Sequence, residues 1–244
     1  MGNCDFCDIE RNINALRADI ERIKEKYSID RNIGILAATK TVPPERINFA
    51  IDKCNISIIG ENRVDELLAK YDDIHKELCE IHLIGALQSN KVSKIIDKVD
   101  LIHSLDRISL AKEIERVAAI REKKVRCLVE VNTGREEAKS GVMPENFFDF
   151  VEEVRKYPHI ELAGVMAVSP ICDDIEGYCN YFSKTYQLFI DFLQKKQHNI
   201  SSELILSMGM SGSYEAAIRC GATLIRPGSI IFGDRNYAFA NDKK

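Results

Sequence analysis

The stretch IGILAATKTVPPERINFAIDK, residues 33–53, contains the unit on which the fold is built. Its first part, Ile33–Ala38, is a short run of mostly aliphatic residues, which favours a buried strand. Two prolines follow, and Pro44–Lys53 then shows the pattern of a helix with proline in its first turn. The stretch therefore predicts a strand followed directly by a helix.

The same unit recurs along the chain. Seven further β-rich runs follow the first: Ile56–Ile59, Ile81–Ile84, Leu101–His103, Val125–Val131, Leu162–Val168, Leu204–Leu206 and Thr223–Ile225. Helical patterns lie between most of them: Lys91–Val99, Ser109–Glu122, Pro144–Lys156, Tyr178–Gln197 and Tyr214–Cys220. An extra helix, roughly Ile9–Tyr27, precedes the first strand, because its isoleucines and leucine recur at spacings of three and four.

Alternating strands and helices predict parallel strands, and eight repeats favour a closed (β/α)₈ TIM barrel. The 244 residues match the usual size of one such barrel, about 250. We therefore expect a single α/β domain over residues 1–244, with 1–30 as an N-terminal extension and helix. The alternative, a doubly wound open sheet, lacks a glycine-rich dinucleotide turn after its first strand.

Composition excludes several classes of protein. Hydrophobic residues make up 45% and charged residues 30% of the chain, which argues against global disorder. The net charge of −4 and the absence of a basic tail argue against a nucleic-acid partner. No apolar run approaches the ~20 residues of a membrane span. Eight scattered cysteines without a secretory signal indicate a reducing compartment, and so we expect a cytoplasmic protein.

The first strand ends in a candidate nucleophile. Alternation along the strand puts Leu36, Ala38 and Lys40 on one face. If that face points inward, Lys40 projects into the mouth of the barrel, where a desolvated lysine is a nucleophile for an aldehyde. The alternative is a surface lysine at the end of a strand.

The last two units suggest where an anion binds. Ser207–Ser213 follows the seventh strand and Arg226–Gly233 follows the eighth, and both are rich in small residues. Such loops expose backbone N–H groups, and barrels often bind phosphate there. Each loop alone could be only a tight turn, and Arg226 could form a salt bridge with Glu130. An aldehyde-bearing phosphate ester would suit both ends of the site, and pyridoxal 5′-phosphate (PLP) is the cofactor with these two groups.

Motifs at consecutive strand ends, spanning nearly the whole chain, also carry a family resemblance. They are residues 37–41 (AATKT), 60–66 (GENRVDE), 82–91 (HLIGALQSNK), 101–107 (LIHSLDR), 129–132 (VEVN), 139–141 (KSG), 206–211 (LSMGMS) and 226–233 (RPGSIIFG). With them the chain resembles the pyridoxal phosphate homeostasis protein family. These fold-type III PLP-binding barrels look like the barrel domain of alanine racemase without its second domain.

The resemblance implies a role for each matching position, with a covalent bond between the cofactor and a lysine. Lys40 matches the lysine that bonds the cofactor, and Arg226 matches the arginine beside the pyridine nitrogen. Asn62 and Met208 match residues that line the cofactor, and His82 and Ile84 lie close to it. The positions that match the phosphate site are Ser207, Gly209, Gly228 and Ser229. His82 could equally be a core histidine. No catalytic residue and no metal ligand is assigned. Pro227 departs from the family pattern and lacks an N–H, so altered phosphate geometry is expected.

The resemblance also implies a role in vitamin B6 homeostasis. We expect a carrier or regulator that holds PLP as a lysine Schiff base and releases it to apo-enzymes, with little or no catalysis. Racemisation needs a second acid–base group, which in the racemase comes from the domain that this chain lacks, and a monomer is expected for the same reason. The alternatives are a PLP-dependent amino-acid racemase or decarboxylase of low activity, and a barrel that binds a sugar phosphate without a covalent bond.

Overall fold

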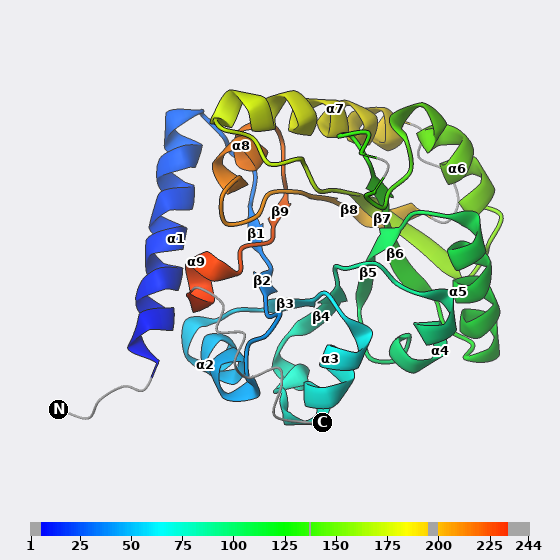
Figure 1. The fold of residues 1–244 in the computed structure, drawn as a ribbon, viewed down its shortest axis with the longest axis horizontal. Helices are drawn as coiled ribbons and strands as arrows, with labels where there is room; N and C mark the ends of the chain where they lie inside the picture. Colours follow the sequence, from blue (N-terminus) through cyan, green and yellow to red (C-terminus); the bar gives the residue numbers. More distant parts are fainter. Residues whose placement is uncertain (1–5, 137, 195–199, 234–244) are drawn as a thin grey trace.

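The computed structural model describes residues 6–136, 138–194 and 200–233, and these contain a single parallel sheet. Its strand segments are β1 Gly34–Ile35, β2 Ala37–Ala38, β3 Ile58–Glu61, β4 Glu80–Leu83, β5 Leu101–Leu105, β6 Val125–Val131, β7 Ile160–Ala167, β8 Ile200–Ser207 and β9 Leu224–Ile225. They pair in the order β1-β9-β8-β7-β6-β5-β4-β3-β2 (Figure 1).

The sheet closes on itself through the first predicted strand. This strand is divided at Leu36 into β1, which pairs with β9, and β2, which pairs with β3. The Leu36 N–H donates to the carbonyl of Ile225 at 2.9 Å, and the Ala38 N–H donates to the carbonyl of Pro227 at 2.8 Å. Proline has no N–H to donate, but its carbonyl still accepts this bond. The eight predicted strands therefore form the closed (β/α)₈ barrel that the sequence predicts.

Helices surround the barrel, as Figure 1 shows. Their bounds are α1 Cys7–Lys26, α2 Pro44–Cys54, α3 Val64–Lys70, α4 Val92–Ile95, α5 Ile108–Ile120, α6 Phe147–Val154, α7 Ile175–Gln194, α8 Tyr214–Arg219 and α9 Ser229–Phe232. Short 3₁₀ turns occupy Tyr71–Asp73, Lys76–Leu78, Ser89–Lys91 and Pro144–Asn146. In the part of the chain described here, none of these helices has the length and apolar character needed to span a bilayer.

The helices agree with the sequence prediction with a few differences. The predicted helix Lys91–Val99 is a 3₁₀ turn followed by the four-residue α4, and Pro144–Lys156 likewise begins with a 3₁₀ turn. Residues 195–197 of the predicted Tyr178–Gln197 helix lie outside the described residues. The short helices α3 and α9 carry too few residues to show an apolar period and were not predicted.

Apolar packing occurs on both sides of the barrel wall. On β6, Cys127 and Val129 belong to the large cluster that includes the surrounding helices, whereas Leu128 belongs to a smaller cluster with Leu101 and Met166. Because successive side chains of a strand alternate, this smaller cluster fills the barrel interior. The N-terminal helix α1 packs its buried isoleucines and Leu16 against α2, α8 and α9 on the outside. This confirms the predicted extra helix.

Candidate functional site

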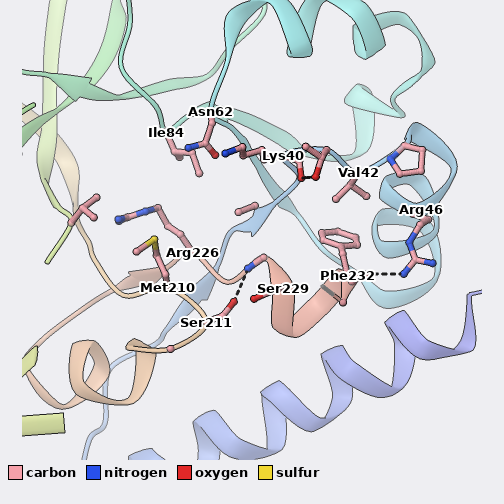
Figure 2. Close-up of a pocket in the computed structure, with 17 residues that line it drawn as sticks. Lys40, Val42, Arg46, Asn62, Ile84, Met210, Ser211, Arg226, Ser229 and Phe232 are labelled. Carbon is pink, nitrogen blue, oxygen red and sulfur yellow. Dashed lines mark hydrogen bonds between the residues drawn. The ribbon is translucent and has the colours of Figure 1, made fainter. Parts of the chain in front are cut away.

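A cavity of about 560 Å³ opens where the strands end, at the face of the barrel that carries function in this fold. Its volume lies within the range of roughly 300–1,000 Å³ that small-molecule sites occupy. The residues that line it are Ala38, Lys40, Thr41, Val42, Pro43, Arg46, Asn62, Ile84, Val168, Met210, Ser211, Gly212, Arg226, Gly228, Ser229, Phe232 and Gly233. Figure 2 shows these side chains around the cavity.

Lys40 lies two residues after the end of β2 and lines the cavity with Ala38, on the same face of this stretch as alternation predicts. Its side chain lies beside Asn62 and Ile84, which follow β3 and β4 (Figure 2). The Lys40 carbonyl accepts a hydrogen bond from the Thr41 hydroxyl at 2.7 Å. Within the described residues, the Lys40 amine takes part in no ion pair, and so it is available to a ligand.

A buried ion pair holds the backbone just before Lys40. The Lys70 ammonium, on α3, lies 2.5 Å from the Glu61 carboxylate at the end of β3. It also donates to the carbonyl of Thr39 at 2.9 Å, while the Thr39 hydroxyl donates to Glu61. Burial raises the pKa of Glu61, and the charge of Lys70 opposes that rise. The ion pair therefore fixes Thr39 and, with it, the position of the next residue.

The backbone just after Lys40 is held by a second carboxylate. The Thr41 N–H donates to Glu66 on α3, and the Glu66 carboxylate lies 3.5 Å from the Lys70 ammonium. Thr41 has a φ of 62°, a left-handed conformation in which residues other than glycine are uncommon. The bond to Glu66 stabilises that conformation, and Lys40 is thus restrained on both sides.

On the opposite wall, the loop after β8 meets the start of α9. The Ser211 hydroxyl accepts hydrogen bonds from the N–H groups of Gly228 at 3.1 Å and Ile230 at 3.3 Å. The N–H groups of Ser211, Gly212 and Ser229 donate to no acceptor among the described residues. These three groups belong to residues that line the cavity, and unpaired N–H groups of this kind attract an anion. We call this wall, with its N–H groups of Ser211, Gly212 and Ser229, the cup.

Arg226 lies between the two walls and is almost fully buried, with 4% of its surface exposed. Its guanidinium donates to the Ser207 hydroxyl at 2.7 Å and to the Ala167 carbonyl at 3.0 Å. Burial lowers the pKa of Arg226 to about 10, and the charge of Glu130 opposes the change. Arg226 therefore remains a cation at neutral pH, and it presents N–H donors to the cavity.

A carboxyl group with an unusual pKa lies on β6. Burial raises the pKa of Glu130 to about 7, the charge of Asp106 adds to the rise, and the charge of Arg226 opposes it. No ion pair joins Glu130 to Arg226 among the described residues, so the alternative salt-bridge role of Arg226 does not apply here. The same residues contain no cluster of three or more side chains able to hold a metal ion.

The structure brings together six of the predicted site residues. These are Lys40, Asn62, Ile84, Arg226, Gly228 and Ser229, and all six line the cavity. Four others do not line the cavity: His82, Ser207 and Met208 are fully buried, and Gly209 makes the turn after β8. Gly209 has a φ of 90°, and a Cβ there would lie 2.5 Å from the Cβ of Ala217. Its role in the structure is to let the chain turn.

Eleven of the residues that line the cavity are not among the predicted site residues, and three of these, Met210, Ser211 and Gly212, lie in the loop after β8. They lie in the same LSMGMSGS stretch, but beyond the turn at Gly209 rather than before it. β8 continues to Ser207, and Met208 remains in the core, so the chain reaches the cavity later than the motif alone suggests. The hydroxyl of Ser211 in a run of small residues is the sequence signal by which this position could have been found.

Comparison with known proteins agrees with this geometry. The family described as alanine racemase, N-terminal domain, matches residues 12–236. The fold and the position of the site thus define a barrel of the alanine racemase N-terminal-domain class. A pyridoxal phosphate homeostasis protein of Aquifex aeolicus is 43% identical over 203 residues, which cover 83% of this chain and 87% of that protein. The chain belongs to the pyridoxal phosphate homeostasis protein family.

Two solved structures resemble the barrel over most of its length. A protein of Bifidobacterium adolescentis described as unknown has a TM-score of 0.89 and 32% identity, covering 95% of this chain and 97% of that one. PipY of Synechococcus elongatus, solved with PLP bound, has a TM-score of 0.78 and 26% identity, covering 92% of this chain and 100% of that one.

Proposed function

We propose that this protein binds PLP covalently through Lys40 and acts as a carrier or regulator of the cofactor in the cell. When bound, PLP would supply an aldehyde, and the Lys40 amine would hold it through a carbon–nitrogen double bond, with release of one water. The observation that supports this most directly is one cavity whose walls carry a lysine amine and several N–H groups that have no partner in the part of the chain that the structure describes.

The cup fits the phosphate of the cofactor. Ser229 opens the four-residue α9, and its N–H and that of Gly212 have no acceptor among the described residues, so both are available to the phosphate. Pro227 supplies no donor, but its carbonyl is engaged in barrel closure and the neighbouring Gly228 keeps its N–H. The Gly228 N–H is directed to Ser211, so the hydroxyl of Ser211 takes part in shaping the cup.

Arg226 determines how the cofactor ring is held. A guanidinium can only donate hydrogen bonds, so it binds a pyridine nitrogen in its unprotonated form. An unprotonated ring is a weaker electron sink, and the site therefore gives little assistance to loss of a proton from a bound amino acid.

The acid–base groups of the cavity favour a carrier over a racemase. Among the described residues that line it, Lys40 is the one able to act as a base, since Arg46 and Arg226 are cations. Arg46 is also occupied by Asp8 and by the carbonyl of Phe232. Inversion of an amino acid needs a group on each face of the ring. We therefore infer storage and release of PLP to apo-enzymes. We also propose that the protein is a cytoplasmic monomer that uses neither a membrane nor a nucleic acid.

Spectroscopy of the purified protein with added PLP tests the covalent bond. We expect an absorption band of a lysine imine that is lost in Lys40→Ala and retained in Lys53→Ala, an exposed lysine on α2. Borohydride reduction followed by peptide mass spectrometry should place the adduct on Lys40. Binding that survives in Lys40→Ala without such a band would favour the non-covalent alternative, a sugar-phosphate site.

Two activity measurements test the carrier role. Incubation of the loaded protein with an apo-PLP enzyme should restore that enzyme's activity as the absorption band declines. Exchange of the α-proton of alanine and other amino acids with solvent deuterium should stay far below ordinary enzyme rates. Rapid exchange would instead identify a racemase or decarboxylase.

A further inference from the structure

A chain of hydrogen bonds crosses the barrel interior beneath the cavity. The Arg226 guanidinium donates to the Ser207 hydroxyl at 2.7 Å, and this oxygen lies 3.1 Å from Nδ1 of His103. Nε2 of His103 lies 3.0 Å from Nδ1 of His82, and Nε2 of His82 lies 2.9 Å from the Glu80 carboxylate. We call Ser207, His103 and His82 the relay. All three are buried, with no more than 1% of their surface exposed.

The relay joins the two faces of the barrel. Arg226 directly follows β9 and lines the cavity at the face where the strands end. Glu80 is the first residue of β4, so it lies at the opposite face, and half of its side-chain surface is exposed. The bonds pass between β4, β5 and β8, which are not all neighbours in the sheet. The relay therefore runs through the barrel interior.

The two ends of the relay determine its direction. Arg226 can only donate, so the Ser207 oxygen accepts there, and among the described residues Nδ1 of His103 is the one acceptor bonded to the single Ser207 hydrogen. His103 then carries its hydrogen on Nε2 and donates it to Nδ1 of His82.

The same logic extends to the far end. His82 accepts at Nδ1, so it carries its hydrogen on Nε2 and donates to Glu80. The bond from His82 is the main cause that lowers the pKa of Glu80, which keeps this carboxyl an acceptor. Every hydrogen bond thus points from the cavity to the far face.

His103 is a neutral ring in this arrangement. Burial is the first cause that lowers the pKa of His103 well below its usual value, and the positive charge of Arg226 adds to it. In this direction Nδ1 of His82 accepts the hydrogen of His103, and Nε2 of His82 donates to Glu80. A single set of proton positions satisfies all members, and such fully satisfied buried networks are rigid.

The relay limits how the guanidinium can turn. One Nη1 hydrogen is held by Ser207 and one Nη2 hydrogen by the carbonyl of Ala167. Two of the five N–H donors of Arg226 are therefore fixed to the barrel wall, and the remaining donors are left for a ligand. Arg226 itself contacts the cavity, whereas His103, His82 and Glu80 do not line it.

We propose that the relay positions the Arg226 guanidinium and that Glu80 anchors the relay at the opposite face of the barrel. This inference rests on the proposed function, in which Arg226 binds the pyridine nitrogen of PLP. His103 and His82 are then positioning residues, and their effect reaches the cofactor through the orientation of one arginine. It also accounts for the predicted site residues Ser207 and His82, which the structure places beneath the cavity.

Paired variants of His103 test the proposal. In His103→Gln the amide oxygen can accept from Ser207 and the amide nitrogen can donate to His82, so the direction of the relay is kept. His103→Leu removes both bonds. We expect PLP to bind His103→Gln within about threefold of the wild-type Kd and His103→Leu roughly tenfold more weakly. The absorption band of bound PLP should shift in the leucine variant alone.

A second pair tests the anchor. Glu80→Gln keeps an acceptor for His82, whereas Glu80→Lys places a donor there. We expect wild-type PLP affinity in the first and measurably weaker affinity in the second, although the change lies at the far face. Glu161→Lys, near the start of β7, is the matched control for the change of charge. Equal Kd values and spectra across both pairs would overturn the proposal.

A measurement without PLP keeps the test independent of the proposed function. Side-chain ¹⁵N NMR of the wild-type protein should show His82 and His103 neutral, with the hydrogen on Nε2 in both. A hydrogen on Nδ1 of His103, or a charged ring, would refute the relay even if PLP binds. If the wild-type protein bound no PLP, the proposed function would fail, and the NMR result would still decide the direction of the relay.

Discussion

Replacing Lys70 by methionine is the sharpest test of how the cavity is held together. The Lys70 side chain is 8% exposed, and the Glu61 carboxylate 2.5 Å away is fully buried. Removing one partner of a buried ion pair costs about 3–5 kcal/mol, because the other charge is left without compensation. One Glu61 oxygen already has no hydrogen-bond partner within the described residues, so nothing there replaces the ammonium.

We expect Lys70→Met to lower the free energy of unfolding by about 3 kcal/mol at pH 7, or roughly 6–12 °C in Tm for a domain of this size. Urea denaturation and calorimetry measure both quantities. In the double variant Glu61→Gln/Lys70→Met the buried group is neutral and still bonds Thr39. It should recover to within about 1 kcal/mol of the wild type.

The loss should also depend on pH. Without Lys70, the pKa of Glu61 in the folded state rises further above its usual value of 4.5. The folded protein then binds a proton that the unfolded chain has released, and stability falls as pH increases above about 4.5. Lys70→Met should therefore be closer to the wild type at pH 5 than at pH 8. A loss below about 1 kcal/mol, equal at both pH values, would refute this account of the ion pair.

Three further predictions concern other parts of the barrel. Ser211→Ala removes the hydroxyl that accepts two N–H groups of the cup, and the Kd for PLP, measured by fluorescence titration, should rise about tenfold. Gly209→Ala introduces a Cβ at positive φ and 2.5 Å from Ala217, and it should cost about 2–3 kcal/mol in urea denaturation. The pKa of Glu130 is about 7, so between pH 5 and pH 8 the wild type should lose up to about 3 kcal/mol that Glu130→Gln retains.

Each of these has a matched control. Ser211→Thr keeps the hydroxyl and should bind PLP like the wild type, and equal loss in both variants would mean that shape rather than the hydroxyl matters. Gly212→Ala, where an added Cβ meets no atom within 4 Å, should be nearly neutral, and a cost equal to that at Gly209 would contradict the steric argument. For Glu130 the sign is decisive, because a stability that rises with pH relative to Glu130→Gln would exclude a raised pKa.

The barrel could be predicted from sequence because each of its strands is a short apolar run with a helical pattern nearby. The positions of Lys40 and Arg226 at the cavity could also be predicted, because the sequence shows where strands end and which residues alternate along them. The division of the first strand at Leu36 could not be predicted, because it depends on pairing with β9, which is distant in sequence.

The contacts inside the barrel could not be predicted from the sequence either. Ser207 and His82 were expected at the cofactor, and the structure places both in the relay. A strand pattern shows that two side chains face inward, but it does not show which of them meet across the barrel. That requires the register of several strands at once, and so His103 emerged as a central residue only from the structure.

Closure of the sheet through Leu36 and Ala38 has a consequence for synthesis. Lys40 is made early and the cup around Ser229 late, and the two become neighbours only when β9 takes its place beside β1. A partly synthesised chain therefore has the amine but no anion cup. A ligand that needs both walls binds the completed ring alone, and by mass action it stabilises the whole barrel rather than any one segment. Occupancy of the cavity would thus report that folding has reached its last strand.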